Sequence, residues 1–417
     1  MEVFKVICAL ALVLALTSAK NYKNHKIVIF TIENEEQLKE LQSLEMNSGV
    51  TFLEAPEAVN TKIALVIQAD LLAMFEELAL ATNLRFKVTS DDLQKIIDSE
   101  KPRKQPKAGF DLEKYNTLEE MHEYMEEMAT AHRSASVFNV GRTTEGRTIK
   151  GVKIMTGLSN PAIFIEANIH AREWISSATA LWIVDKILTT TDPELREIVD
   201  GITWYIVPVT NPDGYAYTYA EDGDRLWRKT KSRHNIFCMG VDPNRNFGYN
   251  WMMGGSSAVA CTTTYAGPSA FSEPETKALM DFYETVPNKM LYLCFHSAAQ
   301  MLIYPLGHTM ETEDVPNVDD LDTIAEAATK AIEETHGTKY IYGNGYKILY
   351  QTSGSSRDHA YGHFKTPLVF TYEMREGPEN IFILPEDEIV PNAEEVFASL
   401  LAIIETGKSL EYFKANL

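Results

Sequence analysis

Positive charge is scarce in this chain, because 38 Lys and Arg stand against 59 Asp and Glu and the formal net charge is -21 at pH 7. A nucleic-acid partner needs a basic face for its phosphate backbone, so we expect none. The sequence also lacks an internal repeat, a low-complexity tract and an Asn-x-Ser/Thr sequon. The apolar stretch 6–16 is shorter than the roughly 20 residues that a bilayer requires, so we expect no membrane association.

Residues 1–19 are typical of a secretory signal peptide. Lys5 precedes the apolar stretch, and the small residues 17–19 follow it. We therefore expect a secreted, extracellular protein whose mature chain begins near Lys20.

Cysteine is rare as well, with four in the whole chain. Cys8 would leave with the signal peptide. In an oxidising compartment Cys238 and Cys261, which flank a Gly/Ser-rich loop, could pair. Cys294 lies within an apolar run and is expected to be an inert buried thiol.

A basic segment rich in Pro and Gly, residues 101–109, follows an acidic, helix-like stretch and divides the chain. A trypsin-like protease could cut after Arg103, Lys104 or Lys107, and the alternative is a plain interdomain linker. We expect a domain boundary here, with one domain over residues 20–107, which includes the basic segment, and a second over residues 108–417.

Residues 20–100 alternate between strand-like and helix-like patterns in the order β-α-β-β-α-β, which is typical of a small ferredoxin-like α+β module. The strands are expected at 25–32, 50–53, 62–68 and 85–88, and the helices at 35–44 and 69–81. A module of this size could act as a lid. Further along, the capping box from Thr117 to Glu120 opens a helix that runs to about His132, and a final amphipathic helix is expected at 392–413.

Three near-continuous apolar runs end in residues that can bind zinc or move protons. The first, starting at Ala162, leads to His170-x-x-Glu173; the second ends at His296 and the third at Glu373. Such runs suit strands buried on both faces of a mostly parallel sheet flanked by helices. Ligands gather beyond the carboxyl ends of such strands, so these side chains should share one crevice and bind zinc.

Two of these side chains, His296 and Glu373, have a simpler interpretation when each is taken alone. His296 could be a core histidine with satisfied hydrogen bonds, and Glu373 could pair with Arg375 where its strand ends. His308 and Glu311 repeat the His-x-x-Glu spacing, but they follow a Pro-Leu-Gly segment and are expected to lie in a loop.

Two polar clusters lie between these runs. Asp242-Pro-Asn244-Arg245 combines an amide with a guanidinium, which suits the binding of a carboxylate, and the alternative is a capped surface turn. The segment 225–231 could be a basic surface loop. If Arg228 were instead buried near zinc, it would polarise a carbonyl group and stabilise an oxyanion.

Together these residues resemble the zinc metallocarboxypeptidases of the pancreatic A/B type in their secreted proenzyme form. The resemblance covers almost the whole chain and implies a carboxypeptidase-like α/β fold. It also implies an inhibitory prodomain over residues 20–107, including the basic activation segment, and a catalytic domain over residues 108–417. Seven motifs carry it, in this order: His170-Ala-Arg-Glu-Trp174, Asn211-Pro-Asp-Gly-Tyr215, Leu226-Trp-Arg-Lys-Thr230, Asp242-x-Asn-Arg-Asn246, His296-Ser297, Tyr350-Gln-x-Ser-Gly354 and Phe370-Thr-Tyr-Glu373.

The resemblance implies one zinc ion per chain with three protein ligands, His170, Glu173 and His296. It assigns catalysis to Glu373, which takes a proton from the attacking water and passes it to the leaving amine, and to Arg228, which with zinc stabilises the oxyanion. Asp242 resembles the acid that accepts a proton from His170 in a hydrogen bond and fixes its tautomer.

On the substrate side, the resemblance implies a clamp on the terminal carboxylate formed by Asn244, Arg245 and Tyr350. Arg172 and Ser297 correspond to subsite contacts, and Cys238 and Cys261 to the family's disulfide. The implied partners are peptide and protein substrates, an activating trypsin-like protease and protein inhibitors, with a monomeric enzyme in a digestive role.

The sequence departs from the usual pattern at Arg357, which corresponds to the floor of the family's specificity pocket. A guanidinium there disfavours basic and apolar side chains, so we expect preference for C-terminal Glu, followed by Asp. The corresponding wall positions are small: Gly307, Gly345 and Thr352. If Arg357 instead pairs with Asp358 and turns out of the pocket, we expect A-type release of apolar residues.

Two further function classes remain open. An inactive binding homologue would lose a ligand or the base, and none is lost here. Another zinc amidohydrolase would not need the carboxylate clamp.

Overall fold

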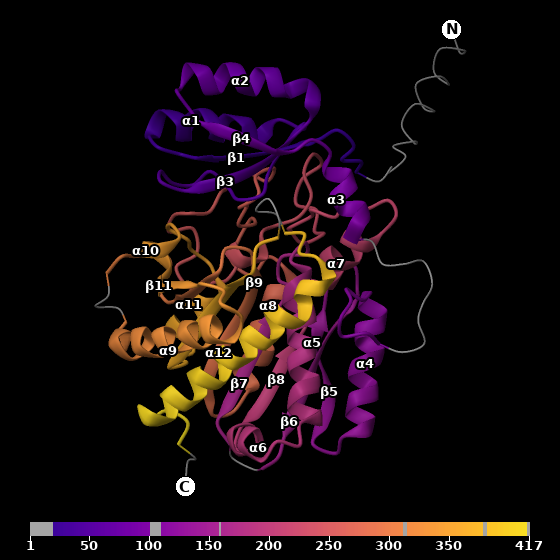
Figure 1. The fold of residues 1–417 in the computed structure, drawn as a ribbon, viewed down its shortest axis with the longest axis vertical. Coiled ribbons are helices and arrows are strands. Elements are labelled where there is room, and N and C mark those ends of the chain that lie inside the picture. The colour runs from indigo at the N-terminus through magenta and orange to yellow at the C-terminus, as the bar shows by residue number, and fades with distance from the viewer. Residues whose placement is uncertain (1–19, 101–109, 158–159, 312–314, 378–381, 415–417) are drawn as a thin grey trace.

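The structure, a computed structural model, describes residues 20–100, 110–157, 160–311, 315–377 and 382–414. The expected signal peptide and the expected cleavage points at Arg103, Lys104 and Lys107 lie outside these ranges. An N-terminal module, drawn in indigo in Figure 1, lies across one end of a larger α/β domain. Among the described helices, none is both long enough and apolar enough to span a membrane.

The N-terminal module has the ferredoxin-like order that the sequence predicts. Its antiparallel sheet has the strand order β2-β3-β1-β4. Val28, Phe30 and Leu65 of the sheet pack against Phe75 of helix α2. The elements are β1 (Lys26–Thr31), α1 (Glu35–Ser43), β2 (Val50–Phe52), β3 (Lys62–Ile67), α2 (Leu72–Ala81) and β4 (Phe86–Ser90), with short 3-10 turns at Leu44–Met46 and Ala69–Leu71.

A further helix, α3 (Leu93–Glu100), falls on the acidic, helix-like stretch that precedes the basic segment. Its buried residues Leu93 and Ile97 belong to an apolar cluster that also contains Leu226 and Phe382 of the larger domain. Helix α3 therefore joins the two parts of the molecule through a shared core.

The larger domain is built on an eight-stranded mixed sheet in the order β11-β10-β12-β9-β7-β8-β6-β5. The four central strands β12, β9, β7 and β8 run parallel, as predicted. The strand bounds are β5 (Ala135–Arg142), β6 (Thr148–Met155), β7 (Ala162–Ala167), β8 (Thr203–Val207), β9 (Lys289–Ser297), β10 (Met301–Tyr304), β11 (Ile341–Asn344) and β12 (Leu368–Met374).

Helices cover both faces of this sheet. One face packs against α4, α5, α9 and α12, and the other against α8 and α11. The helices of the larger domain are α4 (Leu118–Ala131), α5 (Trp174–Thr189), α6 (Pro193–Val199), α7 (Pro212–Tyr219), α8 (Pro274–Thr285), α9 (Val318–His336), α10 (Gly345–Ile348), α11 (Ser356–Gly362) and α12 (Ile389–Ser409), with 3-10 turns at Pro243–Arg245 and Glu386–Glu388.

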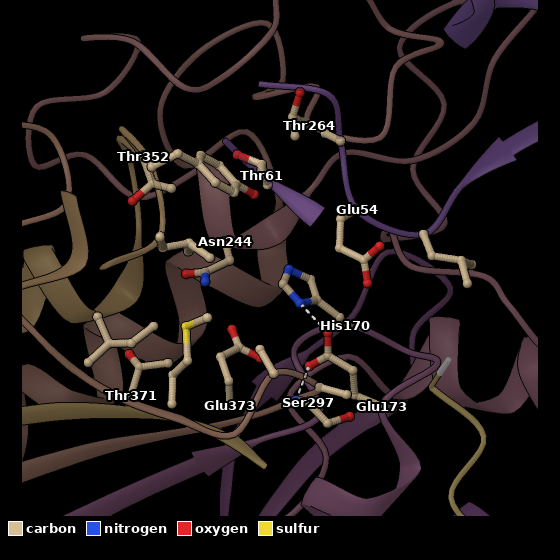
Figure 2. A pocket seen from close by; sticks show the side chains of 18 of the residues that line it. Glu54, Thr61, His170, Glu173, Asn244, Thr264, Ser297, Thr352, Thr371 and Glu373 are labelled. Carbon is tan, nitrogen blue, oxygen red and sulfur yellow. Dashed lines mark hydrogen bonds and ion pairs between the residues drawn. The ribbon is translucent and has the colours of Figure 1, made fainter. Parts of the chain in front are cut away.

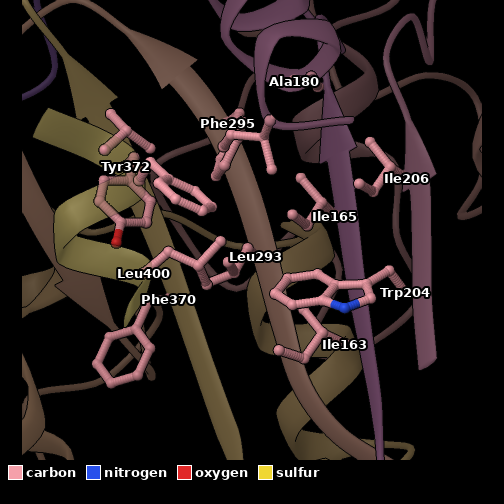
Figure 3. Close-up of a cluster of buried hydrophobic side chains, with 14 of the residues drawn as sticks. Ile163, Ile165, Ala180, Trp204, Ile206, Leu293, Phe295, Phe370, Tyr372 and Leu400 are labelled. Carbon is pink, nitrogen blue, oxygen red and sulfur yellow. The ribbon is translucent and has the colours of Figure 1, made fainter. Parts of the chain in front are cut away.

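Because both faces are covered, neighbouring residues of a central strand are all buried. Ile163 and Ile165 of β7 pack with Leu293 of β9 on one face, as Figure 3 shows, while Phe164 packs into the opposite cluster. Burying each such side chain contributes roughly 1.5–3 kcal/mol to stability. This explains why the three runs are apolar without alternation.

The predicted helix boundaries hold at α4 and shift at α12. Thr117 and Glu120 form the expected capping box at the start of α4. Helix α12 begins at Ile389, before the predicted start at residue 392, and ends at Ser409. The earlier start is possible because Pro391 lies in the first turn, where a missing N–H costs no hydrogen bond within the helix.

Candidate metal centre and active site

The ends of three parallel strands bring the predicted ligands together. His296 lies in β9, and its register partner in β12 is Glu373. His170 follows β7 in a tight turn in which Asn168 adopts a positive φ of 53° and donates its side-chain amide to the carbonyl of Glu173 at 3.1 Å. This turn returns Glu173 to the N-cap of α5, beside His170.

His170, Glu173 and His296 are buried and converge on one point. Nδ1 of His170 lies 2.8 Å from Oε1 of Glu173 and 3.1 Å from Nδ1 of His296. Nδ1 of His296 lies 3.1 Å from Oε2 of Glu173. Ligands at zinc bond lengths of about 2.0–2.1 Å in a tetrahedron lie about 3.3 Å apart. The donor set therefore fits a zinc ion, and within the described ranges it forms the one group of three or more potential metal ligands.

Asp242 fixes the orientation of the His170 ring. Its Oδ1 lies 3.1 Å from Nε2 of His170, and its Oδ2 accepts a hydrogen bond from Nη2 of Arg228 at 2.8 Å. Burial alone would raise the pKa of Asp242, but Arg228 and His170 hold it well below its usual range. The ionised carboxylate accepts Nε2–H and leaves the lone pair of Nδ1 for the metal.

The two carboxyl groups of the site differ electrostatically. Burial would raise the pKa of Glu173, but His170 and His296 lower it below its usual range, so Glu173 is a carboxylate. Burial raises the pKa of Glu373 to about 7, with His296 opposing and Glu173 adding to the rise. Arg375 pairs with Glu395 at 2.9 Å and with Glu388 rather than with Glu373. The carboxyl group of Glu373 is thereby left facing the cavity.

A cavity of about 400 Å³ lies beside the candidate metal site. Figure 2 shows Glu373, Asn244 and Ser297 around it with the two labelled ligands His170 and Glu173. The predicted catalytic residue Arg228 also lines it, together with five of the predicted substrate-binding residues: Asn244, Arg245, Ser297, Tyr350 and Arg357.

Asn244 and Arg245 are held by their surroundings. Oδ1 of Asn244 accepts the backbone N–H of Ser356 at 3.0 Å, and its Nδ2 lies 3.4 Å from Nε2 of His296. Arg245 donates Nε to the carbonyl of Gly255 at 2.8 Å. The hydroxyl of Ser297 is buried and has no hydrogen-bond partner among the described residues.

Arg357 combines the two arrangements that were expected as alternatives, a place in the pocket and a pair with Asp358. Its Nε donates to Oδ1 of Asp358 at 3.1 Å, yet the side chain lines the cavity and is 5% exposed. A Cβ atom at Gly307 would lie 2.3 Å from Nη2 of Arg357, and one at Gly345 would lie 2.8 Å from it. The ion pair therefore forms, but the guanidinium does not turn out of the pocket, and glycines at the wall positions make room for it.

The N-terminal module closes the cavity from the other side. Leu53, Glu54 and Thr61 line it, and Glu54 lies across the cavity from Glu373 (Figure 2). Arg172, predicted as a subsite contact, donates a hydrogen bond to the carbonyl of Leu53. Burial raises the pKa of Glu54 to about 7, although Arg172 opposes the rise.

A second contact between the modules was missed in the sequence. Glu100, at the end of α3, forms a buried ion pair with Arg225, and Nη2 of Arg225 lies 2.7 Å from its Oε1. Arg225 stands in the basic segment that the sequence analysis singled out, but its acidic partner is 125 residues away. No local pattern could have identified the pair.

The remaining predictions concern His308 and the cysteines. His308 lies in a loop, where its ring nitrogens face Asn250 at 2.6 Å and Asp358 at 3.4 Å, and it is not part of the metal group. Cys238 and Cys261 form a disulfide with a Cα–Cα distance of 5.1 Å. Cys294 is free and buried.

Two imidazoles and a carboxylate around one point, with a second carboxyl group across the crevice of a mostly parallel sheet, define a zinc-dependent hydrolase. The family model described as zinc carboxypeptidase matches residues 121–399, and the one described as carboxypeptidase activation peptide matches residues 29–100. The chain belongs to the zinc carboxypeptidase family and, because it carries the activation peptide, is a procarboxypeptidase. The two matches fall on the two modules.

Named relatives agree with this assignment. Zinc carboxypeptidase A 1 of Anopheles gambiae is 38% identical over 98% of this chain and 95% of its own length. The crystal structure of carboxypeptidase A from Helicoverpa armigera has a TM-score of 0.82 and 26% identity, over 93% of this chain and 98% of that one. Bovine thrombin-activatable fibrinolysis inhibitor, solved in complex with tick carboxypeptidase inhibitor, has a TM-score of 0.66 and 31% identity, over 72% and 99% of the two chains.

Proposed function

We propose that this chain is the secreted zymogen of a digestive carboxypeptidase that removes the C-terminal residue of peptides and prefers Glu at that position. His170, Glu173 and His296 would hold the zinc ion. The observation that carries the preference is the buried Arg357 guanidinium in the wall of the cavity beside the metal site.

Each step of peptide hydrolysis has a residue suited to it. Zinc, when bound, supplies Lewis acidity at a carbonyl oxygen and at water. Glu373 takes a proton from the attacking water and delivers it to the leaving amine, and its pKa of about 7 suits both directions of transfer near neutral pH. Arg228 donates hydrogen bonds to the oxyanion that develops on the scissile carbonyl.

Restriction to the chain end comes from the carboxylate clamp. Asn244 offers its amide N–H₂ beside His296. Arg245 carries a positive charge, which opposes the rise that burial causes in the pKa of Tyr350. A terminal carboxylate satisfies these donors, whereas an internal peptide leaves Arg245 without a counter-ion. The same residues distinguish this proposal from another zinc amidohydrolase, which would cleave an amidated peptide equally well.

The preference for Glu follows from what each side chain would meet in the pocket. Asp358 engages Nε of Arg357, and Nη2 lies 3.4 Å from the hydroxyl of Thr352. A glutamate carboxylate can accept from the remaining N–H groups, while a leucine would bury them without partners. Release of apolar residues is the second candidate, favoured by the A-type name of the mosquito relative.

For the zymogen, we propose that the N-terminal module blocks the cavity until a trypsin-like protease cuts after Arg103, Lys104 or Lys107. Two contacts support this latency: the hydrogen bond from Arg172 to Leu53 and the buried ion pair between Arg225 and Glu100. The active form is expected to be a monomer and open to protein inhibitors, as the inhibitor complex of the bovine homologue suggests.

A panel of peptides that differ only in their last residue tests the function, with the protein assayed before and after trypsin treatment. We expect activity after cleavage, fastest release of Glu, and no hydrolysis of the C-terminal amide. Full activity in the uncleaved chain would contradict latency, and faster release of Phe or Leu would establish the A-type alternative.

A further inference from the structure

Glu166 is a buried acid that the proposed reaction does not use. It lies in β7, is 1% exposed and stands opposite Cys294 of β9 in the strand register. Its neighbours Phe164 and Tyr292 belong to the apolar cluster under α8 and α11. Among the described residues, Glu166 forms no ion pair. A carboxyl group in such a layer costs stability unless hydrogen bonds satisfy it.

The main contact of Glu166 leads toward the substrate pocket. Oε1 of Glu166 accepts the hydroxyl of Ser356, the first residue of α11. Sγ of Cys294 also lies 3.4 Å from this hydroxyl. The backbone N–H of the same serine donates to Oδ1 of Asn244 at 3.0 Å. Glu166 therefore connects to the carboxylate clamp through a single residue.

This connection decides which end of the Asn244 amide faces the cavity. A backbone N–H is only a donor, so the oxygen of Asn244 must face Ser356 and its N–H₂ group must face the cavity near His296. Only that orientation presents a donor to a substrate carboxylate. Ser356 also precedes Arg357, so the position of the serine sets where the guanidinium enters the pocket.

We propose that Glu166 is a positioning residue for substrate binding, which holds Ser356 so that Asn244 and Arg357 present their donors to the C-terminal residue of the peptide. The proposal rests on the proposed function and deepens it. Burial raises the pKa of Glu166, with Ser356 and His296 opposing. Oε1 accepts the serine hydroxyl in either protonation state, so the role needs an acceptor and not a charge.

The experiment compares Glu166→Gln, Glu166→Ala and Ser356→Ala in the trypsin-processed enzyme with peptides ending in Glu. Gln keeps an acceptor, so E166Q should keep the wild-type KM. E166A and S356A each break the bond and should raise KM about tenfold, with kcat changed less. In a double variant, E166A with N244A, the effect of E166A on KM should be smaller than in the wild-type background, because part of it acts through the Asn244 amide and only the part that acts through Arg357 remains.

Glu275 provides a matched control. It is another buried glutamate, 1% exposed, whose Oε1 accepts the backbone N–H of Thr144 at 2.9 Å away from the cavity lining. E275A should lower thermal stability and leave KM unchanged. If E166A and S356A leave KM unchanged, as E275A is expected to, the positioning role of Glu166 is wrong. If E166A does not fold, the KM of S356A alone tests the role. An unchanged KM in N244A would instead show that Asn244 does not bind the terminal carboxylate, which contradicts the proposed clamp.

Discussion

Replacing Arg357 by Ser is the perturbation that probes substrate preference most sharply. The side chain is 5% exposed, pairs with Asp358 and lies against Gly307 and Gly345, so its loss leaves a hollow and one less cation in the cavity wall. A hydrogen bond to a charged partner is worth about 1.5–3 kcal/mol. Loss of one such interaction with a glutamate side chain lowers kcat/KM about 10- to 150-fold.

The informative quantity is the ratio of kcat/KM for peptides ending in Glu and in Leu, since general damage to the enzyme cancels in it. We expect the wild type to favour Glu, R357S to lose that preference, and R357K to lie between them because Lys keeps the charge without the planar fork. An unchanged ratio in R357S, or a wild type that favours Leu, refutes the reasoning.

Three further predictions concern the base, the prodomain and the disulfide. Glu373→Gln should lower kcat by about 10²–10⁴-fold while zinc content stays unchanged. The pKa of Glu54 is about 7 in the closed molecule against 4.5 ordinarily, so protonation of Glu54 favours closure. The affinity of the prodomain for the catalytic domain should therefore fall by a factor of about ten or more between about pH 4.5 and about pH 7 and then level off. E54Q should flatten this pH dependence. Removing the disulfide by C238A and C261A should cost about 2–4 kcal/mol in the free energy of unfolding, measured by urea denaturation.

Each of these has a contrary outcome. If E373Q keeps a substantial kcat, Glu373 is not the residue that transfers the proton. If the affinity of the prodomain rises with pH, protonation of Glu54 does not favour closure. Unchanged unfolding in the cysteine variant would show that the disulfide does not constrain the unfolded chain.

The sequence predicted the parts of the fold in which a continuous apolar run or a local capping motif marks the element. Strands β7, β9 and β12 could be recognised because both of their faces are covered, and the ends of these strands then predicted the meeting of His170, His296 and Glu373. The capping box of α4 was equally local. The sequence before the basic segment is helix-like, but it could not show that helix α3 shares an apolar cluster with Leu226 and Phe382 of the other domain.

Contacts through backbone atoms, and long-range contacts that no strand end or motif marks, were not predictable from the sequence. The carbonyl of Leu53, which accepts from Arg172, has no signature in the residue type. Glu166 reads as one residue of a strand until Ser356, 190 residues away, is placed beside it. For Arg357, the sequence offered the pocket or Asp358 as alternatives, and only the geometry shows that one guanidinium serves both.

The most direct test of the account is the zinc content of the purified, trypsin-processed protein, measured by elemental analysis beside its peptidase activity. We expect one zinc per chain, loss of both zinc and activity with a strong chelator, recovery of both on adding zinc, and a zinc content far below one in His296→Ala. A processed protein that releases C-terminal residues without bound metal, or an H296A variant that keeps a full zinc equivalent, would contradict it.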